Sequence, residues 1–345
     1  MKIKTKDFKE ALDIVKPGLA SKELISQTTS FVFAEDSVVT YNDEICIVAP
    51  LANMGFTGAI KSEELYNFLG KVKVEEINLD ITETAIEMKA GRATVGFALA
   101  TEITLPLDEL VVREDWEKLP KKFNKACKFA VQATSDDSSN PKINCVFFDS
   151  KKGHIAATDN YRLVRFDLRR KIPFKTTLIP ASAIKEVIKL KPVMASQGNG
   201  WIHFKNEDEV IISCRVYNET FVDINSVIDA DREDGLLFTF PEQTVEVLDR
   251  AIVFSSANAK VNNIESVELT FKGKFLKIES KTDNAWFKES IPVKGYKGDE
   301  FNFKITPYLL KDILADAGAC MIYQYLLKFE SEDWLYLTSI QLTTD

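Results

Sequence analysis

The chain of 345 residues contains only two histidines, His154 and His203, and five cysteines that lie far apart. Two histidines offer little material for a metal centre or an acid–base catalyst, so we expect neither a metal nor a cofactor. The cysteines include no CxxC pair, and an odd, scattered set indicates reduced thiols in a cytosol rather than disulfides or a zinc site. No apolar run approaches the roughly 20 residues of a membrane span. We therefore expect a cytoplasmic protein that makes no contact with a membrane.

The motifs of common enzyme classes are also missing. There is no GxxxxGK phosphate loop, no GxGxxG segment after a strand, no HExxH pair and no convincing nucleophile–histidine arrangement. Asp159 and Arg162 could form an acid–base centre, but a structural turn pair is the simpler interpretation. The sequence therefore favours a protein without catalytic activity. An enzyme is the competing class, and measurable turnover by the pure protein would establish it.

Short amphipathic helices are predicted at nearly even intervals along the chain. Their ranges are Asp7–Val15, Ser62–Val72, Lys121–Thr134, Ala181–Leu190, Pro241–Ala257 and Thr306–Ala317. Their anchoring apolar residues, roughly 60 residues apart, are Phe8, Leu65, Phe123, Ile184, Val245 and Leu309. A fixed period indicates a repeated unit, here a helix with about four strands, and two units would form a domain of roughly 115 residues. We therefore predict three similar domains, at residues 1–117, 118–234 and 235–345.

Alternating apolar and polar runs between the helices predict antiparallel strands with one buried face. These runs are Phe31–Ala34, Ser37–Tyr41, Ile45–Pro50, Glu76–Ile81, Ala85–Lys89, Ala93–Leu99, Asn144–Asp149, His154–Thr158, Arg162–Leu168, Gly200–Lys205, Glu209–Arg215, Ser266–Phe271, Phe275–Ser280, Ala285–Val293, Ile322–Glu330 and Trp334–Leu342. Acidic linkers are expected at Asp108–Lys118 and Val227–Gly235. The predicted class is α+β, and its open sheet edges must pair across domains or with another subunit.

Lysines gather on some of the predicted helices although the chain has a net charge of −8. In the third helix Lys121, Lys125 and Lys128 lie opposite the apolar face, and the segment contains no acidic residue. In the fourth, Lys185 and Lys189 form a basic pair one turn apart. A solvated surface explains any one such face, but several repeat-related basic helices favour a shared electropositive surface for nucleic acid. The helices of the third domain carry more acidic than basic residues and break this pattern.

Several segments occur in an order and at spacings typical of one known family. Residues 156–163 read AATDNYRL, and residues 179–184 read IPASAI. Residues 1–12 and 301–314 each contain a short strand that leads into a helix. Together these segments resemble the ATDG(H/Y)RL signature, the start of the middle domain's second helix, and the first and last strand–helix steps of the bacterial sliding clamp, the beta subunit of DNA polymerase III. The resemblance covers the whole chain and would suit a phage or mobile-element version as well as a chromosomal one.

The resemblance implies a head-to-tail homodimeric ring of similar clamp domains, with helices lining a central hole and antiparallel sheets outside. Twelve helices spaced about 9–10 Å apart place their axes on a circle of roughly 34–38 Å. Subtracting about 10 Å for helix thickness leaves room for a duplex of about 20 Å. Such a ring is a processivity factor: it encircles duplex DNA without reading sequence and tethers the DNA polymerase, after a clamp loader has placed it.

The charge pattern and the resemblance together predict the surfaces of this ring. The predicted DNA-binding residues are Lys22, Lys71, Lys121, Lys125, Lys128, Lys185 and Lys189. Of these, Lys22 corresponds to a DNA-contacting arginine of the family. Val253 and Phe254 are predicted at the dimer interface, against the strand region Arg92–Leu99 of the partner, although Phe254 could equally be a core residue.

The resemblance also implies a cleft that captures the peptide tails of polymerases and of the clamp loader. Its predicted residues are Ile143, Thr158, Asn160, Tyr161, Arg162, Leu163, Val222, Val227, Leu337, Ile340 and Leu342. Leu163, Val222 and Ile340 could instead be plain core. The family often has glycine where Asn160 stands, and residues 339–345, SIQLTTD, replace its usual proline-containing ending.

Two alternatives stay within the clamp type. A degenerate clamp-like scaffold would bind partners without encircling DNA, and the weakly basic third domain is compatible with it. The two-domain, trimeric type of clamp is disfavoured by three helix-pair domains in one chain.

Overall fold

The computed structural model describes residues 1–52, 54–110, 115–230, 235–262, 265–294, 296, 298–323 and 325–342. The chain forms two compact units, each assembled from separate segments of the sequence. The first unit comprises Met1–Lys128, Cys145–Gly153 and Arg170–Glu219, and the second comprises Phe129–Asn144, His154–Arg169 and Thr220–Asp345. The proposed division into three domains stays a prediction. Residues 111–114 and 231–234 of the expected linkers and residues 343–345 of the ending lie outside the described residues.

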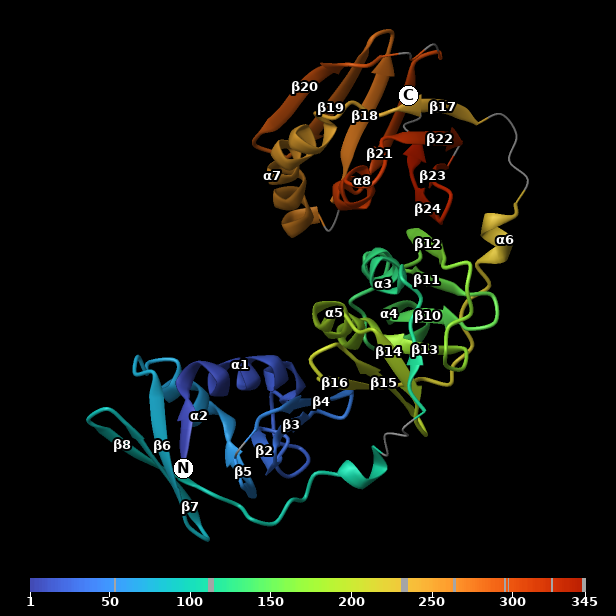
Figure 1. Cartoon of the computed structure of the whole chain (residues 1–345). Coiled ribbons are helices and arrows are strands. Elements are labelled where there is room, and N and C mark those ends of the chain that lie inside the picture. Colours follow the sequence, from blue (N-terminus) through green and yellow to red (C-terminus); the bar gives the residue numbers. More distant parts are fainter. Residues whose placement is uncertain are drawn as a thin grey trace. The chain divides into compact units, whose positions relative to one another are not determined.

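Antiparallel sheets organise the first unit (Figure 1). The larger sheet has the strand order β5-β2-β3-β4-β16-β15-β14-β9, and the smaller has the order β1-β6-β7-β8. The larger contains β2 (Ser30–Glu35), β3 (Ser37–Tyr41), β4 (Ile45–Pro50), β5 (Phe56–Lys61), β9 (Glu117–Lys118), β14 (Met194–Gln197), β15 (Trp201–Lys205) and β16 (Ile211–Arg215). The smaller contains β1 (Lys2–Lys4), β6 (Glu76–Ile81), β7 (Ala85–Ala90) and β8 (Ala93–Ala98). A further antiparallel pair joins β10 (Cys145–Asp149) to β13 (Thr177–Pro180).

The α-helices of the first unit bury apolar residues on one face. They are α1 (Thr5–Val15), α2 (Ser62–Leu69) and α5 (Ala181–Leu190), and the short 3₁₀ turns are η1 (Lys16–Gly18) and η2 (Leu107–Glu109); α3 (Phe123–Val131) begins in this unit and ends in the other. In α1 the buried positions include Phe8, Leu12 and Val15, which share one face of a 3.6-residue period. The α5 helix ends at Leu190, and the next residue, Lys191, has a left-handed φ of 53° that stops the helical repeat.

The second unit also contains antiparallel sheet (Figure 1). One run of strands has the order β11-β12-β24-β23-β22-β17, and the other sheet has the order β20-β19-β18-β21-β25. The first run contains β11 (His154–Thr158), β12 (Arg162–Asp167), β17 (Leu236–Thr239), β22 (Ala319–Tyr323), β23 (Leu326–Glu330) and β24 (Trp334–Ser339). The second sheet contains β18 (Val267–Lys272), β19 (Phe275–Lys281), β20 (Trp286–Pro292), β21 (Phe301–Ile305) and β25 (Gln341–Leu342). The helices are α4 (Pro141–Asn144), α6 (Asn225–Ile228), α7 (Thr244–Asn262) and α8 (Pro307–Leu314), and α7 packs on β19 and β20.

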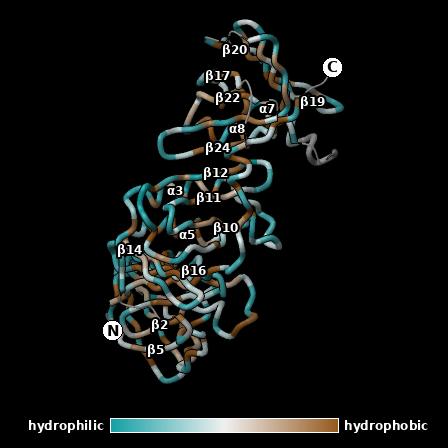
Figure 2. The backbone as a smooth tube through the Cα atoms, turned by 90° about the vertical axis from the view of Figure 1, so that its right-hand side faces the viewer, coloured by the Kyte–Doolittle hydropathy of each residue, from teal (hydrophilic) through white to brown (hydrophobic). Residues whose placement is uncertain are grey.

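Strands from distant parts of the sequence close the sheets. In the first unit β4 pairs with β16, where Ile47 lies opposite Ile212. In the second unit β12 pairs with β24, where Val164 lies opposite Tyr336. These pairings confirm the expectation that strand edges are covered by strands of another predicted domain. In Figure 2 hydrophobic and hydrophilic residues alternate along many strands, as sheets with one buried face require.

All the predicted helices form, and α5 has the predicted bounds. The anchor Val245 is wrong, because it is only half-buried, whereas Val247, Leu248 and Ala251 are buried apolar residues of α7. The predicted strand Ile322–Glu330 is two strands, β22 and β23, that pair with each other. Five short strands, β5, β9, β13, β14 and β17, were missed by the alternation pattern. Strands buried on both faces, such as β13, do not alternate, and β9 has only two residues, within the expected linker Asp108–Lys118.

Candidate pocket and nucleic-acid surface

The turn between β11 and β12 is held by its own polar side chains. The Asp159 carboxylate accepts the backbone N–H groups of Tyr161 and Arg162 at 3.0 and 2.9 Å. The Thr158 hydroxyl donates to the Arg162 carbonyl at 2.7 Å and accepts the N–H of Asn160 at 3.2 Å. Asn160 has a φ of 74°, in the left-handed region that asparagine tolerates better than most residues. This conformation explains why asparagine can stand where glycine is common in the resembled family.

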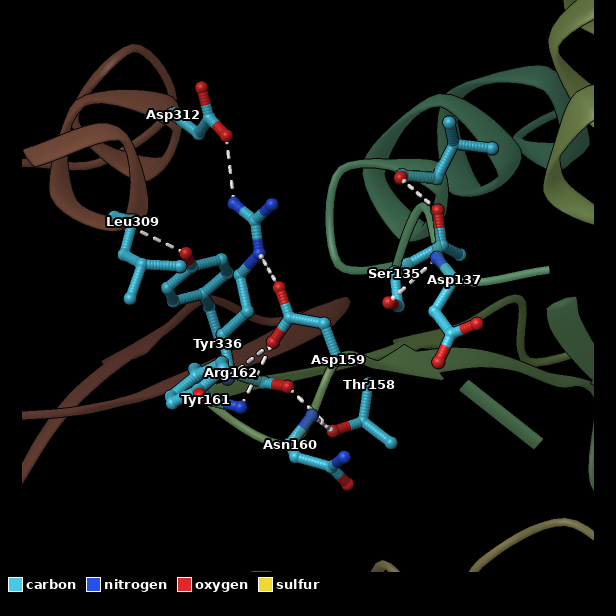
Figure 3. A network of polar contacts seen from close by, with 12 residues as sticks. Ser135, Asp137, Thr158, Asp159, Asn160, Tyr161, Arg162, Leu309, Asp312 and Tyr336 are labelled. Atoms are coloured by element: carbon cyan, nitrogen blue, oxygen red, sulfur yellow. Dashed lines mark hydrogen bonds and ion pairs between the residues drawn. The ribbon is translucent and has the colours of Figure 1, made fainter. Parts of the chain in front are cut away.

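Arg162 connects this turn to helix α8 through a nearly buried ion pair network (Figure 3). Its guanidinium lies 3.0 Å from the Asp159 carboxylate and 2.7 Å from the Asp312 carboxylate. Burial opposes the charge of Arg162, but Tyr336, Asp312 and Asp159 together raise its pKa, so the side chain stays protonated. Burial also raises the pKa of Tyr336, whose neutral hydroxyl donates to the Leu309 carbonyl at 2.6 Å. The network is therefore structural, as the turn-pair interpretation expected.

A pocket of about 330 Å³ opens beside this turn. It is lined by Thr158, Asn160, Tyr161, Arg162, Leu163, Val222, Asp223, Ile224, Val227, Leu326, Leu337 and Ser339. Leu163 and Leu337 are buried at its base, whereas Tyr161 is 64% exposed and Val227 is 43% exposed. The pocket therefore has an apolar base and exposed aromatic and aliphatic side chains at its opening. This arrangement suits an apolar side chain of a ligand.

A second hollow of about 380 Å³ shares Tyr161 and Ser339 with this pocket. Its other lining residues are Glu265, Ser266, Lys304, Ile305, Thr306, Tyr308, Leu309 and Gln341. The Arg162 guanidinium lies 5.2 Å from the centre of the Tyr308 ring, so the same arginine supports both hollows. We refer to the two hollows together as the Tyr161 groove.

The structure brings eight of the eleven predicted cleft residues to the first pocket of the Tyr161 groove. Ile143, Ile340 and Leu342 are not among its lining residues. Ile143 and Ile340 are buried elsewhere, and Leu342 in β25 pairs with Phe303 in β21. Their assignment to the cleft stays a prediction. Sequence reasoning missed Asp223, Ile224, Leu326 and Ser339. For Asp223 and Ile224 the only indication in the sequence was their closeness to the predicted Val222 and Val227. Leu326 and Ser339 reach the pocket only through the pairing of β23 with β24, which the sequence does not show.

The predicted DNA-binding lysines all lie in the first unit and are exposed. On α3 the lysines Lys125 and Lys128 are exposed, while Phe123, Cys127 and Ala130 on the opposite face are buried. On α5 the side chain of Lys185 is exposed, and Lys189 forms an exposed ion pair of 2.7 Å with Glu186. Lys121 precedes α3, Lys71 follows α2, and Lys22 lies in the loop after η1. Helices α1 and α5 both line one hollow of about 530 Å³, so their surfaces adjoin.

The edge strand β20 carries the largest exposed apolar side chains of its sheet. Trp286 is 71% exposed, and Val253 on the neighbouring helix α7 is 66% exposed. Phe254 is half-buried, with its ring 5.9 Å from the ring of Phe287 in β20. Phe254 is thus partly an internal packing residue, whereas Val253 is free to contact a partner. Trp286 was missed by the sequence analysis, since nothing in a strand pattern shows which residue of an edge stays uncovered.

Metal-binding groups and thiols are the other candidates for a functional site within the described ranges. No group of three or more histidine, cysteine, aspartate or glutamate side chains is arranged to hold a metal there. All five cysteines are buried and free, and burial raises the pKa of the Cys46 thiol to about 12. Within those ranges, no helix is both long and apolar enough to cross a bilayer.

Comparison with known proteins defines the fold. No family model and no curated protein matches the sequence. Solved structures do match: the DNA polymerase III beta chain of Streptococcus pneumoniae has a TM-score of 0.82 at 18% identity, with 99% of each chain covered. The beta subunit of Thermotoga maritima has a TM-score of 0.79 at 15% identity, again with 99% of each chain covered. The sliding clamp of Bacillus subtilis has a TM-score of 0.80 at 16% identity and the same coverage.

The chain therefore has, over its whole length, the α+β fold of the bacterial DNA polymerase III beta sliding clamps. This result confirms the predicted fold class. Sequence identities below a fifth show the fold alone, so the function is argued from the surfaces described above.

Proposed function

We propose that this protein is a DNA sliding clamp, a processivity factor that encircles duplex DNA and tethers a DNA polymerase and other DNA-processing proteins. The observation that carries this proposal is the Tyr161 groove: residues predicted from the AATDNYRL segment and from remote parts of the chain line one pocket on a full-length clamp fold. Two independent features of the molecule thus agree with one function.

The groove is proposed to bind the peptide tails of polymerases and of the clamp loader. Its buried leucines and the exposed Tyr161 offer contact for an apolar side chain, and the main chain of β24 runs along its edge. Ser339 already donates its backbone N–H to the Tyr161 carbonyl, so the turn and β24 form a single wall. A short tail with two apolar residues would fill both hollows.

The duplex is proposed to contact the lysines of α3 and α5, together with Lys22 and Lys71. Their long stems meet phosphates without reading bases, which lets a ring slide. Among the described residues, Lys125, Lys128 and Lys185 form no ion pair that would have to break first. If neutralising these lysines left the retention of the protein on circular DNA unchanged at every salt concentration, this assignment would be wrong.

The ring requires a second copy of the chain. We propose a head-to-tail homodimer in which the β20 edge, with Trp286, Val253 and part of Phe254, meets the β8 edge of the partner. Both strands are terminal in their sheets and present unpaired backbone groups. In this role the protein acts without catalysis, in the cytoplasm.

One experiment separates a ring from a clamp-like scaffold. A linear plasmid is incubated with the protein and then ligated into a circle, so that a ring threaded over an open end becomes trapped without a loader. We expect the protein to stay on the circle in a high-salt wash and to leave after a restriction enzyme cuts it. Native mass spectrometry should show twice 38.9 kDa. A monomer that is washed off the closed circle would favour the scaffold.

A further inference from the structure

Two loops of the first unit carry a cluster of exposed cations that the clamp function does not use. Residues 150–153 follow β10, and residues 170–176 precede β13. Their exposed basic side chains are Lys151, Lys152, Arg170, Lys171 and Lys175. We call these five residues the basic loop patch.

The two loops are fixed against each other by hydrogen bonds. Ile172 donates its N–H to the Ser150 carbonyl at 3.3 Å, and Ser150 donates its N–H to the Thr176 hydroxyl at 3.2 Å. The hydroxyls of Ser150 and Thr176 lie 3.1 Å apart. Gly153 has a φ of 72° and lies so close to the Arg170 carbonyl that an added Cβ would be 2.2 Å from its oxygen. The backbones that carry the cations are therefore held together before any ligand arrives.

The charge of the basic loop patch is not neutralised locally. Neither loop contains an acidic residue, and within the described part of the chain none of the five cations forms an ion pair. The adjacent Asp149 carboxylate instead accepts the backbone N–H groups of Lys151 and Lys152 at 3.1 and 3.0 Å. The next cation, Arg169, does pair with Glu332 and is not counted in the patch. Five cations without ion pairs give this part of a chain of net charge −8 a local excess of positive charge, which attracts polyanions.

The character of these loops favours one kind of polyanion. The two loops expose no apolar side chain: Ile172 and Phe174 are buried, and Pro173 is half-buried. A protein partner would usually anchor on exposed aromatic or aliphatic groups, and a single strand would need an aromatic platform for its bases. Phosphates of a duplex need only cations, hydroxyls and backbone N–H groups. The five cations and the hydroxyls of Ser150 and Thr176 supply the first two kinds of group here.

We propose that the basic loop patch binds the phosphate backbone of duplex DNA, at a site separate from the lysines on α3 and α5. This site would hold a duplex that lies against the outside of the protein rather than one that threads a ring. The inference does not rest on ring formation, since the patch belongs to one unit of one chain.

The test uses a duplex of about 30 base pairs with a bulky protein block on each end, so that it cannot thread a ring. Its affinity for the full chain is measured by fluorescence anisotropy over a series of salt concentrations. In the variant Lys151→Gln/Lys152→Gln/Lys171→Gln the slope of log affinity against log salt should become shallower by about 2 to 3, because each lost phosphate contact removes about 0.9.

A matched control removes the same charge elsewhere on the surface. Lys274→Gln/Lys281→Gln/Lys294→Gln changes three exposed lysines of the second unit that form no ion pair among the described residues, and its slope should change by less than about 1. Equal slopes for the patch variant and the control would overturn the proposal. So would unchanged duplex binding combined with lost binding of polyglutamate, which would make the patch a site for acidic protein.

A measurement on the unaltered protein guards against misfolding of the variant. Brief acetylation with and without the blocked duplex, read by mass spectrometry, should show protection of Lys151, Lys152 and Lys171 but not of Lys274 and Lys281. Equal modification of both sets in the two samples would contradict the proposal. Trapping on ligated circles is scored separately, so failure of the patch and failure of the clamp function give different results.

Discussion

Replacement of Arg162 by methionine is expected to destabilise the second unit more than the same replacement of Arg169, which follows the β11–β12 hairpin. The side chain is 7% exposed and forms ion pairs with Asp159, itself 9% exposed, and with Asp312, 36% exposed. Removing one partner of a buried ion pair typically costs about 3–5 kcal/mol, because the other charge is left unpaired.

The structure places this variant at the lower end of that range. Asp159 keeps its two backbone N–H donors. The Asp312 side chain is about one-third exposed, so water can solvate its carboxylate after the arginine is removed. Methionine fills part of the volume of the arginine stem. We therefore expect Arg162→Met to lower the free energy of unfolding of the second unit by about 3 kcal/mol.

A control of the same chemistry lies two residues beyond the end of this hairpin. Arg169 is 50% exposed and pairs with Glu332 at 2.7 Å and Asp333 at 3.7 Å, so Arg169→Met should cost less than about 1 kcal/mol. Urea unfolding gives the free energies, and hydrogen exchange of the amides in β12 and β24 locates the change. Equal losses for the two variants would refute the reasoning that burial decides the value of these ion pairs.

Three further outcomes are expected. Tyr161→Ala should weaken binding of a polymerase-tail peptide at least about tenfold in fluorescence polarisation without lowering the melting temperature, since the ring is 64% exposed; unchanged affinity would remove Tyr161 from the binding site. Trp286→Glu should shift the mass at micromolar concentration from a dimer to 38.9 kDa, and a persistent dimer would place the interface elsewhere. Burial lowers the pKa of His203 to about 4, although Asp115 opposes the shift. Between about pH 6.5 and 4 the unfolded chain therefore binds a proton at His203 that the native state does not bind. Stability should therefore be full above about pH 6.5 and fall by up to about 3 kcal/mol as the pH drops to 4, a loss that His203→Gln should flatten in pH-dependent urea unfolding.

The local pattern of the sequence was enough to predict most individual elements. Helix α5 and strands β3, β4, β6 and β11 have the predicted bounds, because an apolar stripe and an alternating strand are both encoded within a few neighbouring residues. The turn of residues 158–162 was recognisable for the same reason: its hydrogen bonds run between side chains and backbone groups only two to four positions apart.

Contacts between remote segments depended on the tertiary structure. The pairing of β12 with β24 brings Leu337 and Ser339 to the AATDNYRL turn, and the ion pair of Arg162 with Asp312 spans 150 positions. The basic loop patch likewise exists only because residues 150–153 and 170–176 pack together. The sequence by itself determined which segments are helices and strands, and it carried the resemblance to a clamp. Only the tertiary structure decided which strand edges pair, which side chains line a common pocket and which large apolar residues, such as Trp286, remain uncovered. These features depend on long-range packing, which no short window of residues encodes.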